Sequence, residues 1–355
     1  MGDSSPELKK MKQVSDMKAF DDIFPELVQL MTKDGLKDSE VADAMTWHKE
    51  VLEYNCPYGK KNRGLTVVHS YQYLVGDKAT EEDLKLARIL GWCVEFLQAF
   101  FLVADDIMDA SVTRRGQPCW YKLEKVGLIA TNDSIYIENT IYVILKKYFK
   151  SKPYYVELIE LMHEVTLQTI TGQTLDLITA PTDHIDFSNY TIERYNAIVK
   201  YKTAFYSFYL PVALAMHMAG IEDEAAFDSA RVILLKMGEF FQIQDDYIDC
   251  FGDPTLTGKV GTDIEDNKCG WLIVQALTRV SAEQRQVLEE NYAKKDAECV
   301  AKVKAVYKEL KLQRVYADYE ENSYNELIQL IDQLDVSLPR KMFTAYADKI
   351  YKRDR

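Results

Sequence analysis

The chain has 355 residues, of which 47% are hydrophobic and 28% are charged, so it can bury a sizeable core and still present a polar surface. Its 56 acidic residues outnumber its 43 basic residues, and the net charge of −13 argues against a nucleic-acid-binding protein, because phosphate backbones require a basic surface. Only 15 glycines and 9 prolines are present, which leaves little room for a turn-rich β fold.

Apolar residues recur at helical spacing through most of the chain. Asp38 and Thr80 are expected to cap helices, and Thr80 begins a T-x-x-D capping box. The predicted helices cover residues 15–32, 38–54, 65–74, 80–111, 134–148, 154–178, 192–200, 203–219, 223–251, 269–280, 282–292, 297–310, 312–334 and 341–352. We therefore predict an all-α fold, a large helical bundle that forms a single domain over residues 1–355, with a flexible N-terminal segment at 1–15.

The cysteines and the N-terminus indicate the compartment. None of the six cysteines forms a C-x-x-C pair or a zinc-ligand pattern with histidine, so we expect free thiols. No apolar signal core begins the chain, and the most apolar window, 89–108, is interrupted by Glu95, Gln98, Asp105 and Asp106. The sequence predicts a soluble cytoplasmic protein without a transmembrane segment.

An acidic cluster follows the apolar residues 99–104. On a helix, Asp105 and Asp109 lie one turn apart on one face, and Asp106 flanks them. A second cluster, Asp245, Asp246 and Asp249, repeats this spacing after a similar apolar segment. A solvated acidic face could explain one such cluster, but two in one helical chain favour a site that holds cations.

Carboxylates grouped in this way repel each other unless cations lie between them. Ligand sets made only of oxygen select a hard ion, so Mg²⁺ fits better than zinc, and its natural guest is a diphosphate. Cationic partners for a diphosphate are available at residues 59–64, at Arg114 and Arg115, at Lys202 and at Lys259. This supply suggests two phosphate sites, one dependent on metal and one independent of it.

Several longer motifs now carry a specific resemblance. These motifs are D-D-x-x-D with T-R-R-G-Q at 105–117, G-Q-x-x-D-L at 172–177, K-Y-K-T at 200–203 and G-E-F-F-Q-I-Q-D-D-Y-I-D-C-F-G-D-P at 238–254. With them the chain resembles the trans-prenyltransferases (isoprenyl diphosphate synthases), and within these the eukaryotic farnesyl diphosphate synthases, from about residue 40 to the C-terminus. The resemblance implies an isoprenoid synthase fold with a central cavity, a homodimer, and about three Mg²⁺ per site.

The resemblance also implies roles for individual residues. Asp105, Asp109 and Asp176 would ligate one pair of Mg²⁺ ions, with Asp106 as a further candidate ligand. Asp245 would ligate a third ion, supported by Asp246 and Asp249. The allylic diphosphate would bind Arg114, Lys202 and Lys259. Isopentenyl diphosphate would bind Lys60, Asn62, Arg63, Gln98 and Arg115. Thr203, Gln242 and the carbonyl of Lys202 would lie near the allylic cation.

The implied reaction joins dimethylallyl diphosphate, and then geranyl diphosphate, to isopentenyl diphosphate. Ionisation forms the allylic cation, the double bond of isopentenyl diphosphate attacks it, and loss of a proton gives (E,E)-farnesyl diphosphate. Phe101 lies one helical turn before Asp105, and Phe100 is its neighbour. Two phenylalanines are usually ordinary core, but the resemblance implies that these rings limit the length of the product.

Two other functions remain open from the sequence. A terpene synthase built on this scaffold would ionise a prenyl diphosphate without condensing it, and a non-catalytic subunit would only bind one. The chain also departs from the family pattern. Tyr58 replaces the first glycine of a Gly-Gly-Lys motif, and Lys61 follows Lys60. Further departures are Ile170, Thr171 and, in the basic tail, Asp354.

Overall fold

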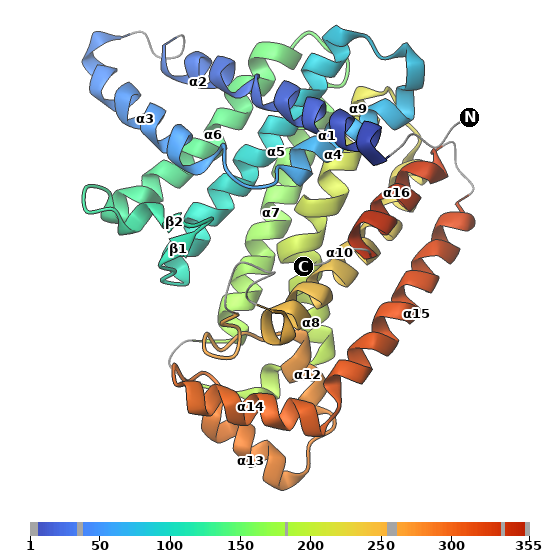
Figure 1. The fold of residues 1–355 in the computed structure, drawn as a ribbon. Helices are drawn as coiled ribbons and strands as arrows, with labels where there is room; N and C mark the ends of the chain where they lie inside the picture. The colour runs from blue at the N-terminus through green and yellow to red at the C-terminus, as the bar shows by residue number, and fades with distance from the viewer. Residues whose placement is uncertain (1–5, 34–37, 182–183, 254–260, 335–337, 352–355) are drawn as a thin grey trace. The chain divides into compact units, whose positions relative to one another are not determined.

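The computed structural model describes residues 6–33, 38–181, 184–253, 261–334 and 338–351, with side chains from residue 14 onward. Within these ranges the regular structure is helical except for one short hairpin (Figure 1). The all-α prediction is therefore confirmed. The chain divides into two compact units. The single domain expected from the sequence would span both units and stays a prediction.

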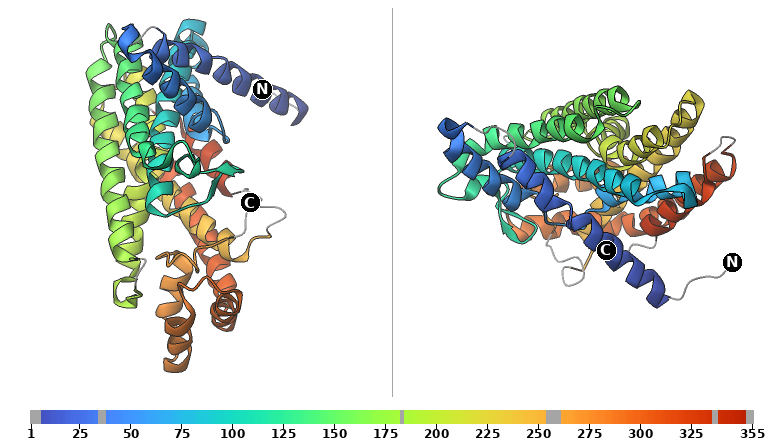
Figure 2. Two further views of the ribbon diagram at one scale, coloured as in Figure 1. Left: turned by 90° about the vertical axis from the view of Figure 1, so that its left-hand side faces the viewer. Right: turned by 90° about the horizontal axis from the view of Figure 1, so that it is seen from above.

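The first unit comprises residues 1–163 and 210–222. Its helices and strands, including helix α7, which continues into the second unit, are α1 (Pro6–Asp21), α2 (Phe24–Thr32), η1 (Ser39–Val41), α3 (Ala42–Asn55), α4 (Asn62–Val75), η2 (Gly76–Lys78), α5 (Glu81–Met108), β1 (Thr113–Arg114), β2 (Gln117–Pro118), η3 (Trp120–Lys122), η4 (Gly127–Ile129), α6 (Ala130–Phe149), α7 (Tyr155–Thr179) and α9 (Leu210–Met218). Helix α1 crosses α4, and α5 packs along α6 (Figures 1 and 2).

The second unit comprises residues 164–209 and 223–355. Besides the end of α7, its helices are η5 (Phe187–Asn189), α8 (Ile192–Ile198), η6 (Val199–Tyr209), α10 (Glu224–Phe251), α12 (Trp271–Leu277), α13 (Ala282–Asn291), α14 (Ala297–Glu309), α15 (Leu312–Asp332) and α16 (Arg340–Tyr351). Helix α10 packs along η6. Helix α13 pairs with α14 (Figure 1).

The N-terminal helices differ from the prediction. The helix expected over 15–32 is two helices, because Pro25 stands at the start of α2 and cannot continue the hydrogen bonding of α1. Helix α1 also begins at Pro6, inside the segment expected to be flexible. The predicted caps are confirmed, because Asp38 accepts from the N–H of Glu40, and Thr80 forms a complete capping box with Asp83.

Helices α4 and α5 approach each other closely within the first unit. A Cβ atom on Gly64 would lie 2.8 Å from the carbonyl oxygen of Gly91, and one on Gly91 would lie 2.5 Å from the carbonyl oxygen of Gly64. Phe20 of α1 covers this crossing, and its ring stacks on Trp92 at 4.9 Å. The two glycines therefore bring the start of α4 against the middle of α5.

The second unit contains an unusual helical stretch. Residues 199–209 form a π-helix, where the sequence predicted a break between two α-helices. A Cβ atom on Gly172 of α7 would lie 2.1 Å from the backbone nitrogen of Lys202, and one on Gly238 of α10 would lie 2.4 Å from Cβ of Ala204. These glycines fix the π-helix between α7 and α10.

Helix α5 is long and apolar enough to cross a membrane, but most of its apolar stretch is buried inside the protein, as in a core helix. All six cysteines are free thiols, as expected. Burial raises the pKa of Cys119 and Cys250 to about 12, so neither thiol is reactive near neutral pH.

Candidate active site

The first acidic cluster lies at the C-terminal end of helix α5. Asp105 and Asp106 are in its last turn, and Asp109 is its C-cap. The helix ends there because Ala110 adopts a left-handed conformation and the N–H of Ser111 bonds to the carbonyl oxygen of Asp106 at 3.0 Å. The negative end of a helix dipole disfavours carboxylates, so this cluster requires nearby positive charge.

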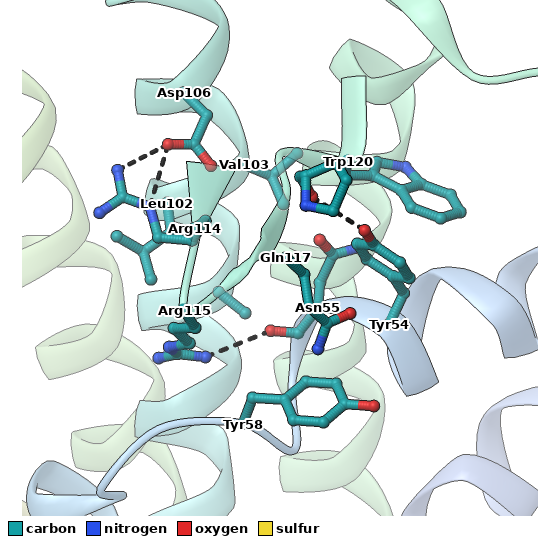
Figure 3. Close-up of a pocket in the computed structure, with 12 residues that line it drawn as sticks. Tyr54, Asn55, Tyr58, Leu102, Val103, Asp106, Arg114, Arg115, Gln117 and Trp120 are labelled. Atoms are coloured by element: carbon teal, nitrogen blue, oxygen red, sulfur yellow. Dashed lines mark hydrogen bonds and ion pairs between the residues drawn. The ribbon is translucent and has the colours of Figure 1, made fainter. Parts of the chain in front are cut away.

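Arg114 supplies part of that charge. Its Nε and Nη2 atoms donate to Oδ1 of Asp106 at 3.0 and 2.6 Å (Figure 3). Nη2 also lies 3.8 Å from Oδ2 of Asp105. Burial acts to lower the pKa of Arg114, but the hydrogen bond and charge of Asp106 and the charge of Asp105 outweigh it and raise that pKa. Asp106 is only 3% exposed, whereas Asp105 and Asp109 are partly exposed. The middle carboxylate therefore holds Arg114, and the outer two face partly outward.

A hairpin turn places Arg115. Arg115 and Gly116 connect strands β1 and β2, both with positive φ, which is the type of two-residue turn that suits a hairpin. Nη1 of Arg115 lies 3.5 Å from the carbonyl oxygen of Asn55 (Figure 3). Gly59 has a φ of +99°, and a Cβ atom there would lie 2.9 Å from Cζ of Arg115. The glycine thus makes room for the guanidinium.

A pocket lies beside these arginines, between the end of α3, helix α5 and the hairpin (Figure 3). Tyr54, Tyr58 and Trp120 give it aromatic walls, and the hydroxyl of Tyr54 donates to the carbonyl oxygen of Pro118 at 2.8 Å. Tyr58, one of the departures from the family pattern, is therefore part of a pocket wall.

The start of helix α4 carries the other residues predicted for isopentenyl diphosphate. Lys60 and Asn62 are exposed, and Arg63 is half-buried. Lys61 is instead in an ion pair with Asp21 at 2.8 Å, so this extra lysine ties the loop to α1. On α5, Oε1 of Gln98 is buried with no hydrogen-bond partner among the described residues, which leaves it available to a ligand.

Phe100 and Phe101 lie in contact on α5. Their ring centroids are 4.8 Å apart with a tilt of 39°, and both rings are half-buried. This partial exposure distinguishes them from Phe96, one turn earlier, which is fully buried against Trp92 and Phe24. The role of the two rings in product length stays a prediction.

The second acidic cluster lies near the C-terminal end of α10. Like the first cluster, it has a buried middle aspartate between two partly exposed ones. Asp246 is buried and accepts hydrogen bonds from Tyr195 Oη at 2.7 Å, from the N–H of Trp271 at 2.8 Å and from Gln242 Nε2 at 2.9 Å. Burial raises its pKa to about 6, against the effect of these three bonds. Asp245 and Asp249 are partly exposed, and Asp249 accepts from the N–H of Asp263 at 3.1 Å.

Three predicted residues form one hydrogen-bonded chain in the second unit. Thr203 Oγ1 donates to Gln242 Oε1 at 3.3 Å, and Gln242 in turn donates to Asp246. Thr203 lies in the π-helix, whose irregular backbone is a frequent mark of a functional segment. The structure therefore joins the residues predicted near the cation to the second acidic cluster.

Asp176 forms ion pairs with two lysines. Lys202 Nζ is 2.5 Å and Lys268 Nζ is 3.7 Å from Oδ2 of Asp176. Burial acts to raise the pKa of Asp176, but the charges of both lysines lower it overall. Lys268 was not among the residues predicted from the sequence, because an isolated lysine in a loop has no distinguishing pattern. In the structure its neighbour Asn267 lies in the left-handed region and accepts a hydrogen bond from the hydroxyl of Tyr190 at 2.8 Å, which no sequence pattern indicated.

The remaining predicted residues are less informative. Lys259 and Asp354 lie outside the described residues. Ile170 and Thr171, which depart from the family pattern, are exposed on α7. The hydroxyl of Thr171 donates to the carbonyl oxygen of Leu167 at 2.8 Å, a bond within the helix that does not involve the candidate site residues.

The site chemistry fits a hard divalent cation. The candidate ligands are all carboxylates, which supply the oxygen atoms that Mg²⁺ prefers. One of them, Asp176, also lies beside a basic side chain that could contact a phosphate. No three acidic, histidine or cysteine side chains of the described residues are gathered closely enough to hold an ion by themselves. Oxygens from the ligand itself would be needed to complete the coordination.

Comparison with known proteins gives a consistent answer. The sequence pattern of the polyprenyl synthetase family matches residues 45–310. The chain is 57% identical to the farnesyl pyrophosphate synthase of Gallus gallus, over 94% of this chain and 91% of that protein. It is 50% identical to the farnesyl pyrophosphate synthase of Saccharomyces cerevisiae, over 95% and 97%. The crystal structure of T. brucei farnesyl diphosphate synthase superposes with a TM-score of 0.89 at 34% identity, over 95% of this chain and 99% of that one. The isoprenoid synthase fold expected from the sequence is confirmed.

Proposed function

We propose that this chain, which belongs to the polyprenyl synthetase family, is a prenyltransferase that makes (E,E)-farnesyl diphosphate. One observation carries the proposal. At each acidic cluster the middle aspartate is held by the protein, by Arg114 in one case and by Tyr195 and Gln242 in the other, while the first aspartate remains partly exposed. This arrangement presents carboxylates to cations and basic side chains to a diphosphate.

Ionisation of the allylic substrate depends on stabilising the departing diphosphate. Arg114 and Lys202 supply fixed positive charge, and Lys268, beside the same Asp176, adds to it. Bound Mg²⁺, held by Asp105, Asp109, Asp176 and Asp245, would supply the rest of the charge that the leaving group requires. We propose three ions per site.

Condensation requires a second bound substrate. Lys60, Asn62, Arg63, Gln98 and Arg115 would hold the diphosphate of isopentenyl diphosphate. Thr203 and Gln242 would place their dipoles near the allylic cation, in an order fixed by the bond between them. Attack by the double bond forms the new C–C bond, and the released proton passes to the free diphosphate.

Incubation of the protein with geranyl diphosphate, with and without isopentenyl diphosphate and Mg²⁺, tests the proposal. We expect farnesyl diphosphate only when all three are present, detected by chromatography of the dephosphorylated products. Terpene hydrocarbons from geranyl diphosphate alone would indicate a terpene synthase, and binding without turnover would indicate a non-catalytic subunit.

We also propose a cytoplasmic homodimer. Large apolar side chains are exposed along α6 and α7, namely Ile135 and Val143 on α6, Val156 on the part of α7 in the first unit, and Leu167, Ile170 and Ile178 on its remainder. Exposed apolar side chains of this kind favour contact with a protein partner. A second copy of the chain presents the same side chains, so two copies can cover each other in a symmetric dimer. Sedimentation equilibrium would give twice the chain mass of 41.0 kDa, and a monomer mass would contradict the proposal.

Gly59→Ala tests the isopentenyl diphosphate site. The new methyl group meets the guanidinium of Arg115, so we expect the KM for isopentenyl diphosphate to rise several-fold, with about 1–2 kcal/mol lost from stability through the positive φ. The matched control is Gly76→Ala, whose φ is +61° and whose Cβ would meet nothing within 4 Å. Steady-state kinetics and thermal unfolding measure both. An equal change in KM in the control would show that backbone strain alone is responsible.

A further inference from the structure

Glu95 is a buried acid that the proposed mechanism does not use. It lies in the apolar middle of α5 and is only 4% exposed. Burying a carboxylate is costly unless hydrogen bonds or opposite charges compensate for it. The contacts of Glu95 therefore indicate its purpose.

The first contact is with the start of helix α4. Oε1 of Glu95 accepts the N–H of Gly64, the third residue of that helix, at 2.8 Å. The N-cap residue, Lys61, has a φ of 49° and provides no side-chain acceptor, so Glu95 supplies from another helix what the N-cap lacks. Its negative charge also suits the positive end of the α4 dipole.

The second contact is electrostatic. Burial raises the pKa of Glu95, while the N–H of Gly64 and the charges of Arg63, Arg115 and Lys61 act to lower it. For Arg115, burial lowers the pKa, the charge of Glu95 raises it, and Arg63 and Arg114 lower it further. Arg63 and Arg115 thus repel each other, and Glu95 is the buried carboxylate that acts on both.

These contacts connect residues that are distant in the sequence. Arg63 belongs to the first turn of α4, Arg115 to the hairpin turn, and Glu95 to α5. Glycines at positions 64 and 91 allow the approach, since a Cβ atom on Gly64 would lie 3.0 Å from Cγ of Glu95. One acid therefore fixes the backbone next to Arg63, and its charge also acts on Arg115.

We propose that Glu95 is a positioning residue for the isopentenyl diphosphate site, an inference that rests on the proposed function. The side chain of Glu95 caps α4 next to Arg63, and its negative charge offsets the repulsion between Arg63 and Arg115, so that both guanidinium groups can face one diphosphate. It does not touch the reacting atoms.

The sign of the effect in Glu95→Gln tests the proposal. Glutamine keeps an acceptor for the N–H of Gly64 but removes the charge. Removing a negative charge near an anion site would by itself strengthen anion binding, so only a loss of positioning can weaken it. We expect the KM for isopentenyl diphosphate to rise about tenfold, while the KM for geranyl diphosphate stays within about twofold. Glu95→Ala, which also removes the acceptor, raises the former KM further.

The control is Asp133→Asn in the same unit. Asp133 is fully buried and accepts from the indoles of Trp47 and Trp120 at 2.9 and 2.8 Å, so its loss lowers stability, and these two bonds involve neither Arg63 nor Arg115. We expect a lower melting temperature and an unchanged KM for isopentenyl diphosphate in this variant. Equal rises of both KM values in Glu95→Gln, with a lower melting temperature, would reduce Glu95 to a structural role and overturn the proposal.

A second measurement separates this proposal from the proposed function. Calorimetric titration of the full-length protein with isopentenyl diphosphate in the absence of Mg²⁺ should show about tenfold weaker binding in Glu95→Gln than in the wild type. Unchanged or tighter binding in the variant overturns the role of Glu95. A wild type that binds isopentenyl diphosphate but forms no farnesyl diphosphate overturns the proposed function instead.

Discussion

Replacing Asp105 with asparagine is expected to lower kcat by about a thousandfold while leaving the melting temperature nearly unchanged. Asp105 is partly exposed at the negative end of α5, and its carboxylate is a proposed Mg²⁺ ligand rather than a contact of the core. Asparagine keeps the shape of the side chain but removes the charge that a divalent cation requires. Steady-state assays with saturating geranyl and isopentenyl diphosphate, over a range of Mg²⁺ concentrations, measure the loss.

The neighbouring Asp106→Asn provides the comparison. Asp106 is buried and accepts two hydrogen bonds from Arg114, so this change leaves the partly exposed guanidinium without its charged partner and is expected to cost roughly 2 kcal/mol of stability. A fall in melting temperature should therefore accompany any loss of activity. Equal losses of activity and of stability in the two variants would contradict the assignment of Asp105 as a Mg²⁺ ligand and of Asp106 as the partner of Arg114.

The difference between the buried and the partly exposed aspartates could not be predicted from the sequence. The spacing of the two clusters correctly indicated carboxylates on one helical face, and it listed Asp106 and Asp246 with the others as candidate ligands. Which carboxylate is buried depends on partners far along the chain, such as Tyr195 and Trp271 for Asp246. Helical periodicity contains no information about those partners.

The helices were predictable where local signals determine them, as at the Thr80 capping box. They were less predictable where packing overrides the local preference. The π-helix at 199–209 depends on the close approach of α7 and α10 at Gly172 and Gly238. The hairpin that presents Arg115 depends on one two-residue turn within a stretch that contains few apolar residues.

Glu95 shows the same limit in the site itself. In the sequence it appears only as a polar interruption of an apolar window. In the structure it accepts the N–H of Gly64, next to Arg63, at 2.8 Å. A buried charge in a core helix is a signal that sequence analysis can detect, but its partner becomes clear only when the helices are assembled.

Removing both rings in a Phe100→Ala, Phe101→Ala variant is expected to shift the main product from fifteen carbons to twenty or more. The two rings are in contact and only half-buried on α5, one turn before Asp105, which is about 6 Å along the helix axis. If the first carboxylate marks the diphosphate end of the substrate, side chains at this position meet its growing hydrocarbon tail. Chromatography of the dephosphorylated products, with geranyl and isopentenyl diphosphate as substrates, gives the chain lengths.

Phe96→Ala is the matched control on the same helix. Phe96 is fully buried between Trp92 and Phe24, so its loss creates a core cavity and is expected to cost about 3–5 kcal/mol of stability without lengthening the product. The double variant should instead lose little stability and make a longer product, because the two half-buried rings pack less into the core and are accessible to a substrate. An unchanged product length in the double variant would contradict the assignment, and longer products from Phe96→Ala would place the limit deeper in the helix.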